Sequence, residues 1–213
     1  MSKLGIFISI EGVEGVGKST NLAYVQSLLD TAGIDHVTTR EPGGTEIAEK
    51  IRDLLLDKSN TGMTDQTELM LVFAARAQHV RSFIQPAINE GKWVICDRFT
   101  DSTYAYQGGG RQMAPELIRE LEVIAIDGYE PDHTLLLDLP TEIGLGRASK
   151  RGELDRFESE SQKFFSRVRA AFLERATQFE QRFTVIDASH DLETVQASIE
   201  KALTPTIAKW CAD

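Results

Sequence analysis

Residues 6–19 read Ile-Phe-Ile-Ser-Ile-Glu-Gly-Val-Glu-Gly-Val-Gly-Lys-Ser, an apolar run followed by the pattern G-x-x-x-x-G-K-S at Gly12–Ser19. In such a loop the glycines let backbone N–H groups approach phosphate oxygens, and the start of the next helix adds its dipole. Lys18 would reach the β- and γ-phosphates and the Ser19 hydroxyl would coordinate Mg²⁺. A glycine-rich turn without a ligand is the alternative, but the strand before the loop and the helix-forming stretch after it favour nucleotide binding.

Short apolar runs alternate with longer segments of helical period along all 213 residues. Strands are expected at Ile6–Ile10, His36–Thr39, Trp93–Cys96, Thr134–Leu139 and Phe183–Ile186. Helices are expected at Ser19–Thr31, Ile47–Leu56, Gln66–Glu90, Pro115–Ile126, Thr141–Lys150, Gln162–Arg182 and Leu192–Ala208. This alternation predicts one α/β domain over residues 1–213, a three-layer α/β/α P-loop NTPase fold with a five-stranded parallel sheet. Ligands of such sheets bind at the carboxyl ends of the strands.

The composition limits the partners of the chain. Asp and Glu number 33 against 23 Lys and Arg, giving a net charge of −10. A protein that binds nucleic acid or an anionic membrane needs a broad basic face, so we expect neither partner. No apolar stretch is long enough to span a membrane. The two cysteines, Cys96 and Cys211, form no disulfide framework, which predicts a cytoplasmic protein.

An acid and an arginine, Asp97 and Arg98, directly follow the third expected strand. At the carboxyl end of a strand near the phosphate loop, this pair suits Mg²⁺ and a second phosphate, although a surface ion pair is the alternative. An Asn-Lys-x-Asp sequence is absent and no expected strand ends in an Asp-Glu pair. A switch GTPase and a motor ATPase are therefore disfavoured.

Three further clusters indicate a second substrate. Arg40–Gly44 follows the second strand, Phe73–Arg76 lies in a long helical segment, and Tyr104–Arg111 follows Asp97-Arg98. Together they supply aromatic groups, arginines and an amide, which are the groups that recognise a base and a monophosphate. Taken singly, each has a structural explanation, since Phe73 suits a core and the glycines of Tyr104–Arg111 suit a flexible turn.

Residues 147–157 are rich in cations, namely Arg147, Lys150, Arg151 and Arg156. Gly152 interrupts this segment as a hinge would. A mobile arginine cluster that closes over the site would neutralise charge during phosphoryl transfer and exclude water. We therefore expect a lid at about residues 147–157, with a solvated basic helix end as the alternative.

This combination resembles the thymidylate kinase family over essentially the whole chain and in the family's order. The most specific motifs are Arg-Glu-Pro-Gly-Gly at 40–44, Asp-Arg-Phe at 97–99 and Ala-Tyr-Gln-Gly at 105–108. The resemblance implies ATP-dependent phosphorylation of dTMP to dTDP with Mg²⁺, a nucleoside monophosphate kinase fold, and a homodimer. Rival interpretations are a kinase for another nucleoside monophosphate or for a nucleoside, and a non-catalytic nucleotide-binding module.

The resemblance also assigns roles to single residues. Arg98 would hold the dTMP phosphate, and Glu41 would orient Arg98. Arg76 would donate to a thymine carbonyl. Some members of the family carry a catalytic arginine in the phosphate loop at the place of Gly15. Because glycine stands there, the chain resembles the bacterial branch, in which the lid supplies the arginine. Arg151 is the residue expected in that role, with Arg147 and Arg156 as neighbours.

The residues implied to bind ATP are Gly12, Val13, Glu14, Gly15, Val16, Gly17, Lys18, Ser19, Thr20 and Arg147. Those implied to bind dTMP are Glu14, Glu41, Pro42, Arg52, Val72, Phe73, Arg76, Arg98, Thr103, Tyr106 and Gln107. Lys18, Arg98 and Arg151 are implied to be catalytic, and Ser19 and Asp97 to hold Mg²⁺. The family commonly places its base-stacking aromatic residue four positions before the base-reading arginine. Val72 occupies that position and Phe73 lies three before Arg76, so both are candidates to pack on the base.

Overall fold

The computed structural model describes residues 3–148 and 155–212. Its five strands form one parallel sheet in the order β2-β3-β1-β4-β5. The strands are β1 Phe7–Glu11, β2 His36–Arg40, β3 Trp93–Asp97, β4 His133–Asp138 and β5 Phe183–Asp187. The helices are α1 Lys18–Thr31, α2 Glu46–Leu56, α3 Asp65–His79, η1 Val80–Ile84, α4 Gln85–Asn89, α5 Thr100–Thr103, η2 Tyr104–Gly110, α6 Pro115–Ile126, α7 Thr141–Ala148, α8 Gln162–Gln178 and α9 Leu192–Ala212. The expected fold class is confirmed.

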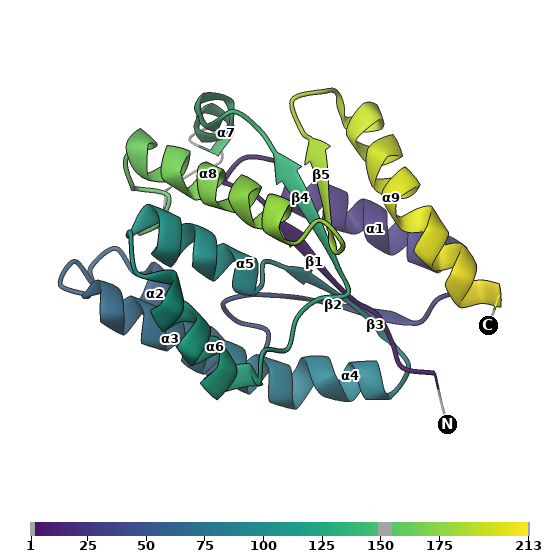
Figure 1. Cartoon of the computed structure of the whole chain (residues 1–213), viewed down its shortest axis with the longest axis horizontal. Coiled ribbons are helices and arrows are strands. Elements are labelled where there is room, and N and C mark those ends of the chain that lie inside the picture. Colours follow the sequence, from purple (N-terminus) through teal and green to yellow (C-terminus); the bar gives the residue numbers. More distant parts are fainter. Residues whose placement is uncertain (1–2, 149–154, 213) are drawn as a thin grey trace.

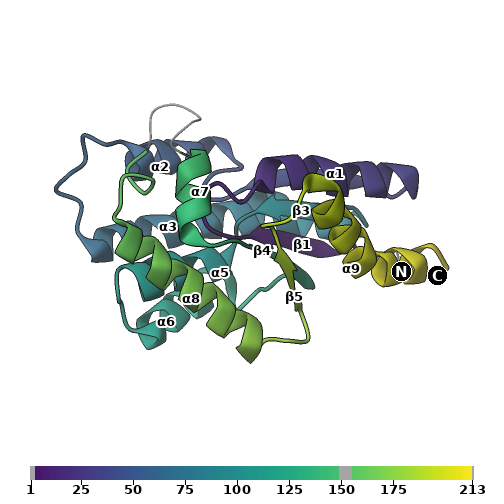
Figure 2. The ribbon, with the colours of Figure 1, turned by 90° about the horizontal axis from the view of Figure 1, so that it is seen from above.

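Helices cover both faces of the sheet (Figures 1 and 2). The side chains of each strand pack alternately against the two helical layers, because successive side chains of a strand point to opposite faces of the sheet. On β3, Trp93 and Ile95 pack in one core with side chains of α1 and α9, whereas Val94 and Cys96 pack in a second core with η1 and α4. Both chain ends lie away from the carboxyl ends of the strands, which leaves those ends free for a site (Figure 1).

The long helix expected over Gln66–Glu90 is continuous but not uniform. It runs as α3, then widens into the π-helical turn η1, and resumes as α4. The N–H of Gln85 donates to the carbonyl of Val80, five residues before it. Pro86 follows directly and has no N–H to continue the regular pattern, so the widened turn lies where the proline interrupts the α-helical hydrogen bonds.

The segment after Arg98 was expected to be a flexible turn and is instead helical, as α5 and η2. Two of the glycines of η2, Gly109 and Gly110, are needed there because α8 packs directly against them. A Cβ atom on Gly109 would lie 2.7 Å from Cβ of Ala171, and one on Gly110 would lie 2.4 Å from the ring of Phe164. Arg167 then donates to the carbonyls of both glycines at 3.2 and 2.6 Å. Close packing, and not mobility, explains this glycine run.

Two helices end at residues other than those expected. Helix α8 stops at Gln178 instead of continuing to Arg182, and α9 extends to Ala212 with Pro205 inside it. Helix α7 is described as far as Ala148, so the last two residues of its expected range lie outside the described residues. Within the described part of the chain, every helix is too short or too polar to cross a membrane.

Asp101 of α5 ties the segment after β3 to α8 and to the start of β5. Its carboxylate is fully buried and accepts from Arg175 Nε at 2.5 Å and from Arg182 Nη1 at 2.7 Å. Burial alone would raise the pKa of Asp101, but the hydrogen bonds and charges of Arg182 and Arg175 lower it below its usual value. The carboxylate therefore stays ionised between two arginines.

Replacing Asp101 by Asn should lower the free energy of unfolding by about 3 kcal/mol, because two buried guanidinium groups lose their counter-charge. Urea denaturation at neutral pH measures this loss. Asp127→Asn is the matched control: Asp127 pairs with Arg81 at the surface, with side chains 80% and 55% exposed, and should change little. Equal stability of the Asp101→Asn variant and the wild type would contradict a stabilising role for this cluster.

Candidate functional site

The phosphate loop joins β1 to α1 in a conformation that strongly favours glycine. Gly15 and Gly17 have φ of 75° and 89°, in the left-handed region. A Cβ atom on Gly15 would lie 2.0 Å from the carbonyl oxygen of Gly144 in α7. An arginine therefore does not fit at position 15 without movement of this backbone.

Lys18 is held within the loop that it is expected to serve. Its ammonium donates to the carbonyls of Gly12 and Val13, each at 3.1 Å. Burial, together with the positive charge of Arg98, lowers the pKa of Lys18 to about 8. An anionic ligand in the loop would favour the charged form, so phosphate binding and protonation of Lys18 support each other.

Arg98 lies directly after β3 in a strained backbone conformation, with φ of 70°. Such a conformation is unusual for a residue with a side chain and requires support from its surroundings. The N–H of Arg98 donates to the Ile10 carbonyl at 3.0 Å. The Glu11 carboxylate accepts from the N–H of Phe99 at 2.7 Å and from the Ser102 hydroxyl at 2.6 Å. The end of β1 thereby holds the turn that carries Arg98.

Glu11 itself is fully buried, and burial with the nearby charge of Asp101 raises its pKa to about 8. The sequence interpretation did not include Glu11 or Ser102 in the site. The signals that point to them are local: Glu11 immediately precedes the phosphate loop, and Ser102 follows Arg98 by one helical turn.

The guanidinium of Arg98 reaches back to the phosphate loop. Its Nη1 donates to the Gly12 carbonyl at 2.9 Å, and its Nη2 donates to Glu14 Oε1 at 2.9 Å. The hydroxyl of Tyr106 donates to the other oxygen of Glu14 at 2.5 Å. Burial opposes the charge on Arg98, but Tyr106 and the surrounding carboxylates outweigh it and raise its pKa above the usual value. Arg98 is thus a permanent cation beside the loop.

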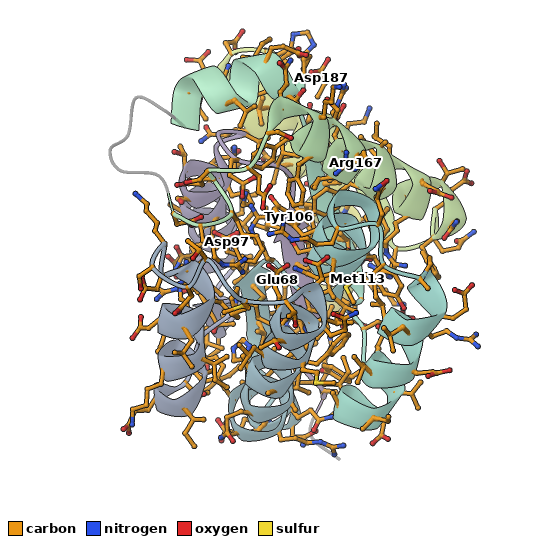
Figure 3. All side chains as sticks on the ribbon, turned by 90° about the vertical axis from the view of Figure 1, so that its left-hand side faces the viewer. Glu68, Asp97, Tyr106, Met113, Arg167 and Asp187 are labelled. Atoms are coloured by element: carbon orange, nitrogen blue, oxygen red, sulfur yellow. The ribbon has the colours of Figure 1, made fainter. Side chains whose placement is uncertain are left out.

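A pocket opens beside Arg98 at the carboxyl ends of β2 and β3, and Asp97 and Tyr106 of its wall lie in the middle of the view in Figure 3. Its lining residues are Glu14, Arg40, Glu41, Pro42, Arg52, Leu56, Val72, Arg76, Asp97, Arg98, Phe99, Ser102, Thr103, Tyr106, Gln107, Asp155 and Phe157. All residues expected to bind dTMP except Phe73 are among them. The structure therefore brings three separate sequence motifs to one cavity.

Phe73 lies in the core and not on the pocket wall. Its ring packs with Leu69 and Ile118, and only its face approaches the Arg76 guanidinium, 5.1 Å from the ring centre. Val72, one position earlier, lines the pocket. Of the two candidates to pack on the base, Val72 therefore faces the pocket and Phe73 faces the core, because one residue along a helix turns a side chain by about 100°.

The expectation that Glu41 orients Arg98 is also wrong. The Glu41 carboxylate accepts from Arg76 Nε at 2.6 Å and contacts His79 Nδ1 at 2.9 Å. Arg76 in turn donates from Nη1 to the Thr103 hydroxyl at 2.8 Å. Glu41 is therefore the residue that orients Arg76, and His79, which no sequence pattern indicated, supports it from behind.

Asp97 is suited to a divalent cation. Its Oδ1 is buried and has no hydrogen-bond partner among the described residues, which is a costly state for a carboxylate oxygen. Asp97 also lines a neighbouring hollow together with Ser19 of the phosphate loop. Among the described residues no three His, Cys, Asp or Glu side chains gather into a metal site. Mg²⁺ commonly uses only one or two protein ligands and takes the others from phosphates and water, so this donor set fits it.

The lid residues are described only at their two ends. Arg147 is exposed in the last turn of α7, and Arg151 lies outside the described residues. The guanidinium of Arg156 is turned toward α2 and α3, since its Nε donates to the Leu55 carbonyl at 2.7 Å and its Nη2 lies 2.7 Å from Glu68 Oε2. Arg156 is thus engaged by these helices, away from the phosphate loop.

Comparison with known proteins agrees with this geometry. The sequence profile of the family described as "Thymidylate kinase" matches residues 10–199. The thymidylate kinase of Pseudomonas putida (strain GB-1) is 54% identical over 207 residues, 97% of this chain and 98% of that protein. That of Chromohalobacter salexigens is 54% identical over 208 residues, with 97% and 98% coverage. The crystal structure of thymidylate kinase from Ehrlichia chaffeensis superposes with a TM-score of 0.76 at 33% identity, covering 94% of this chain and 98% of that one. The chain belongs to the thymidylate kinase family.

Proposed function

We propose that the pocket beside Arg98 binds dTMP, that the phosphate loop binds ATP, and that the γ-phosphoryl group passes directly between them. As a member of its family the chain is an ATP:dTMP phosphotransferase that forms dTDP. The observation that supports this placement is the position of Arg98, which contacts the loop carbonyl of Gly12 and also lines the pocket. One cation therefore lies between the two binding places.

Phosphoryl transfer requires positioning and neutralisation of charge more than acid–base chemistry. An ionised phosphate of dTMP is already a nucleophile, so no covalent enzyme intermediate is needed. Lys18 would neutralise the β- and γ-phosphates and Arg98 would align the acceptor phosphate. Ser19 and Asp97 would hold Mg²⁺, which would supply positive charge to neutralise the phosphates. Arg151 of the lid would add a further cation to the transferring group.

The lining of the pocket offers groups for both parts of a nucleoside monophosphate. Arg98 and Arg52 would supply cations for the phosphate, and burial with the nearby charge of Arg40 lowers the pKa of Arg52. Arg76 and Gln107 would supply polar groups for a base, and Val72 would supply apolar surface. Glu14, held between Arg98 and Tyr106, would face the sugar 3′-hydroxyl.

The proposed function is tested by incubating the purified protein with ATP, Mg²⁺ and one monophosphate at a time, and measuring ADP formation. Turnover with dTMP well above that with dCMP, dGMP and AMP is the expected result. Turnover with a different monophosphate would be consistent with the proposed mechanism but would refute the assignment of the base-binding residues. Tight ATP binding without any turnover would indicate a binding module.

Arg98→Ala should lower kcat/KM for dTMP by roughly 100-fold or more, because the acceptor phosphate loses its charge-assisted contact. The KM for ATP should change much less, since Lys18 and the loop N–H groups remain. Steady-state kinetics with each substrate varied in turn separates the two effects. Arg81→Ala is the control, because Arg81 lies outside the pocket lining and its exposed side chain pairs with Asp127. A loss confined to the KM for ATP would contradict the role of Arg98.

We also propose a homodimer that forms through α2, α3 and α6. These helices lie side by side on one flank of the molecule (Figures 1 and 2). They expose large apolar side chains: Leu54 of α2 is 52% exposed, Met70 of α3 is 62% exposed and Ile124 of α6 is 78% exposed. A soluble monomer seldom leaves such a set uncovered on adjacent elements, whereas a second copy of the chain would bury it.

Met70→Glu should shift the protein from dimer to monomer at micromolar concentration, because a charge would be buried at the centre of this face. Sedimentation velocity measures the change in mass. Leu192→Glu is the control: Leu192 is 49% exposed at the start of α9, outside this set of helices, and its replacement should leave the dimer intact. A monomeric wild type would refute the proposed dimer outright.

The two cysteines and the net charge support our proposals for the cell compartment and the other partners. Cys96 is buried and Cys211 is exposed, and both are free thiols, which agrees with a reducing cytoplasm. Because the chain has a net charge of −10, we propose that its ligands are small phosphorylated molecules and not nucleic acid or a membrane.

A further inference from the structure

Gln107 is the one carboxamide on the pocket wall among the described residues, and its orientation decides which base edge the pocket accepts. A carboxamide offers an accepting oxygen on one side and a donating NH₂ on the other. Thymine and uracil present an N3–H donor between two carbonyls, whereas cytosine presents an N3 acceptor beside an amino group. An amide with its oxygen toward the ligand therefore suits thymine and uracil and disfavours cytosine.

Glu68 of α3 determines that orientation. Its carboxylate is 1% exposed, and its Oε1 accepts from Gln107 Nε2 at 2.8 Å. Arg111 donates to both carboxylate oxygens, from Nε at 3.2 Å and from Nη2 at 3.1 Å. Figure 3 shows Glu68 in the interior, just below Tyr106 in that view. Glu68 does not line the pocket, so it acts from behind Gln107.

The charge state of Glu68 excludes the flipped amide. Burial would raise its pKa, but hydrogen bonds from Arg111 and Gln107 and the charges of Arg111 and Arg156 lower it below the usual value. An ionised carboxylate can only accept hydrogen bonds. If Gln107 turned its oxygen toward Glu68, two acceptors would meet in a buried site, which is costly. The NH₂ group therefore faces Glu68, and the amide oxygen is the group that remains for a ligand.

Arg76 supplies the complementary donor on the same pocket wall. Its Nε and Nη1 are engaged by Glu41 and Thr103. Its Nη2 is the remaining guanidinium nitrogen and suits a carbonyl of the base. The acceptor on Gln107 matches N3–H of thymine or uracil, and the donor on Arg76 matches the adjacent carbonyl. Cytosine mismatches both, because it presents an acceptor at N3 and an amino group beside it.

We propose that Glu68 is the positioning residue for base selection: by holding the NH₂ of Gln107, it presents the amide oxygen to the pocket and selects pyrimidines that carry N3–H over cytosine. This inference rests on the proposed binding of dTMP in the same pocket. It extends that assignment to a residue that touches no substrate. A role confined to packing Arg111 and Arg156 is the alternative.

The test uses Glu68→Gln in the full-length protein. A neutral amide at position 68 can donate or accept, so it permits both orientations of Gln107. The ratio of kcat/KM for dTMP to that for dCMP should fall by roughly tenfold or more, because a buried donor–acceptor mismatch supplies discrimination of at least that order. The ratio for dTMP to dUMP should stay unchanged, since both bases carry N3–H. Glu160→Gln is the matched control: it removes another carboxylate that pairs with Arg111 and keeps the contact between Glu68 and Gln107.

Two outcomes would overturn the proposal. Both come from a folded Glu68→Gln variant whose dTMP-to-dCMP ratio is unchanged: either its activity is retained with all three pyrimidine substrates, or its activity falls equally with all three, as a packing role would produce. Titration calorimetry with dTMP, dUMP and dCMP measures the same preference without turnover. A wild type that binds dTMP preferentially but does not phosphorylate it would refute the proposed function and still test the role of Glu68.

A measurement on the wild type covers the case in which Glu68→Gln does not fold. The side-chain NH₂ of Gln107 should exchange slowly with water in the NMR spectrum of the ligand-free protein, because it donates to a buried carboxylate. The side chain of Gln112, an exposed residue, provides the comparison in the same spectrum. Exchange at Gln107 as fast as at Gln112 would contradict the orientation on which the proposal depends.

Discussion

The contact between the end of β1 and the turn after β3 is the constraint on which the site depends. Arg98 occupies a left-handed backbone conformation that its side chain disfavours, and Glu11 with the Ile10 carbonyl holds it there. Because β1 and β3 are neighbours in the sheet, this turn lies beside the phosphate loop that follows β1. The guanidinium can then reach the Gly12 carbonyl and Glu14 while it still lines the pocket. The neighbouring carboxyl ends of β1 and β3 thus place a permanent cation between two phosphate-binding regions.

Behind this contact, acids are paired with arginines in the interior. Glu41 holds Arg76, Glu68 holds Arg111, and Asp101 holds Arg175 and Arg182. Compared with well-packed apolar residues, buried ion pairs add little net stability, although removing one partner alone is costly, and each pair limits the directions in which a side chain can point. In this protein that restriction serves recognition, because Glu41 holds Arg76 and Glu68 holds Gln107, and both held side chains line the pocket.

The sequence interpretation succeeded where function depends on residues that are adjacent in the chain. The phosphate loop, the Arg40–Gly44 segment and the Asp97-Arg98 pair are local motifs, and the structure brings them together at the carboxyl ends of β1, β2 and β3. It left open whether Val72 or Phe73 faces the pocket, because one residue along a helix decides the facing. It was wrong about the partner of Glu41, since Arg76 and Arg98 are both arginines distant in sequence and no pattern distinguishes them.

The order of apolar and helical segments determined the class of fold, and the loop at Gly12–Ser19 determined that the chain handles phosphate, because both depend on short-range backbone chemistry. Only the tertiary structure decided that the glycines of η2 admit α8 at close range, that Glu68 lies behind Gln107, and that Arg156 is turned away from the phosphate loop. Each of these depends on side chains that the sheet order and helix packing bring together from distant parts of the chain. A buried carboxylate orients whichever donor the fold places beside it, and a linear sequence does not specify that neighbour.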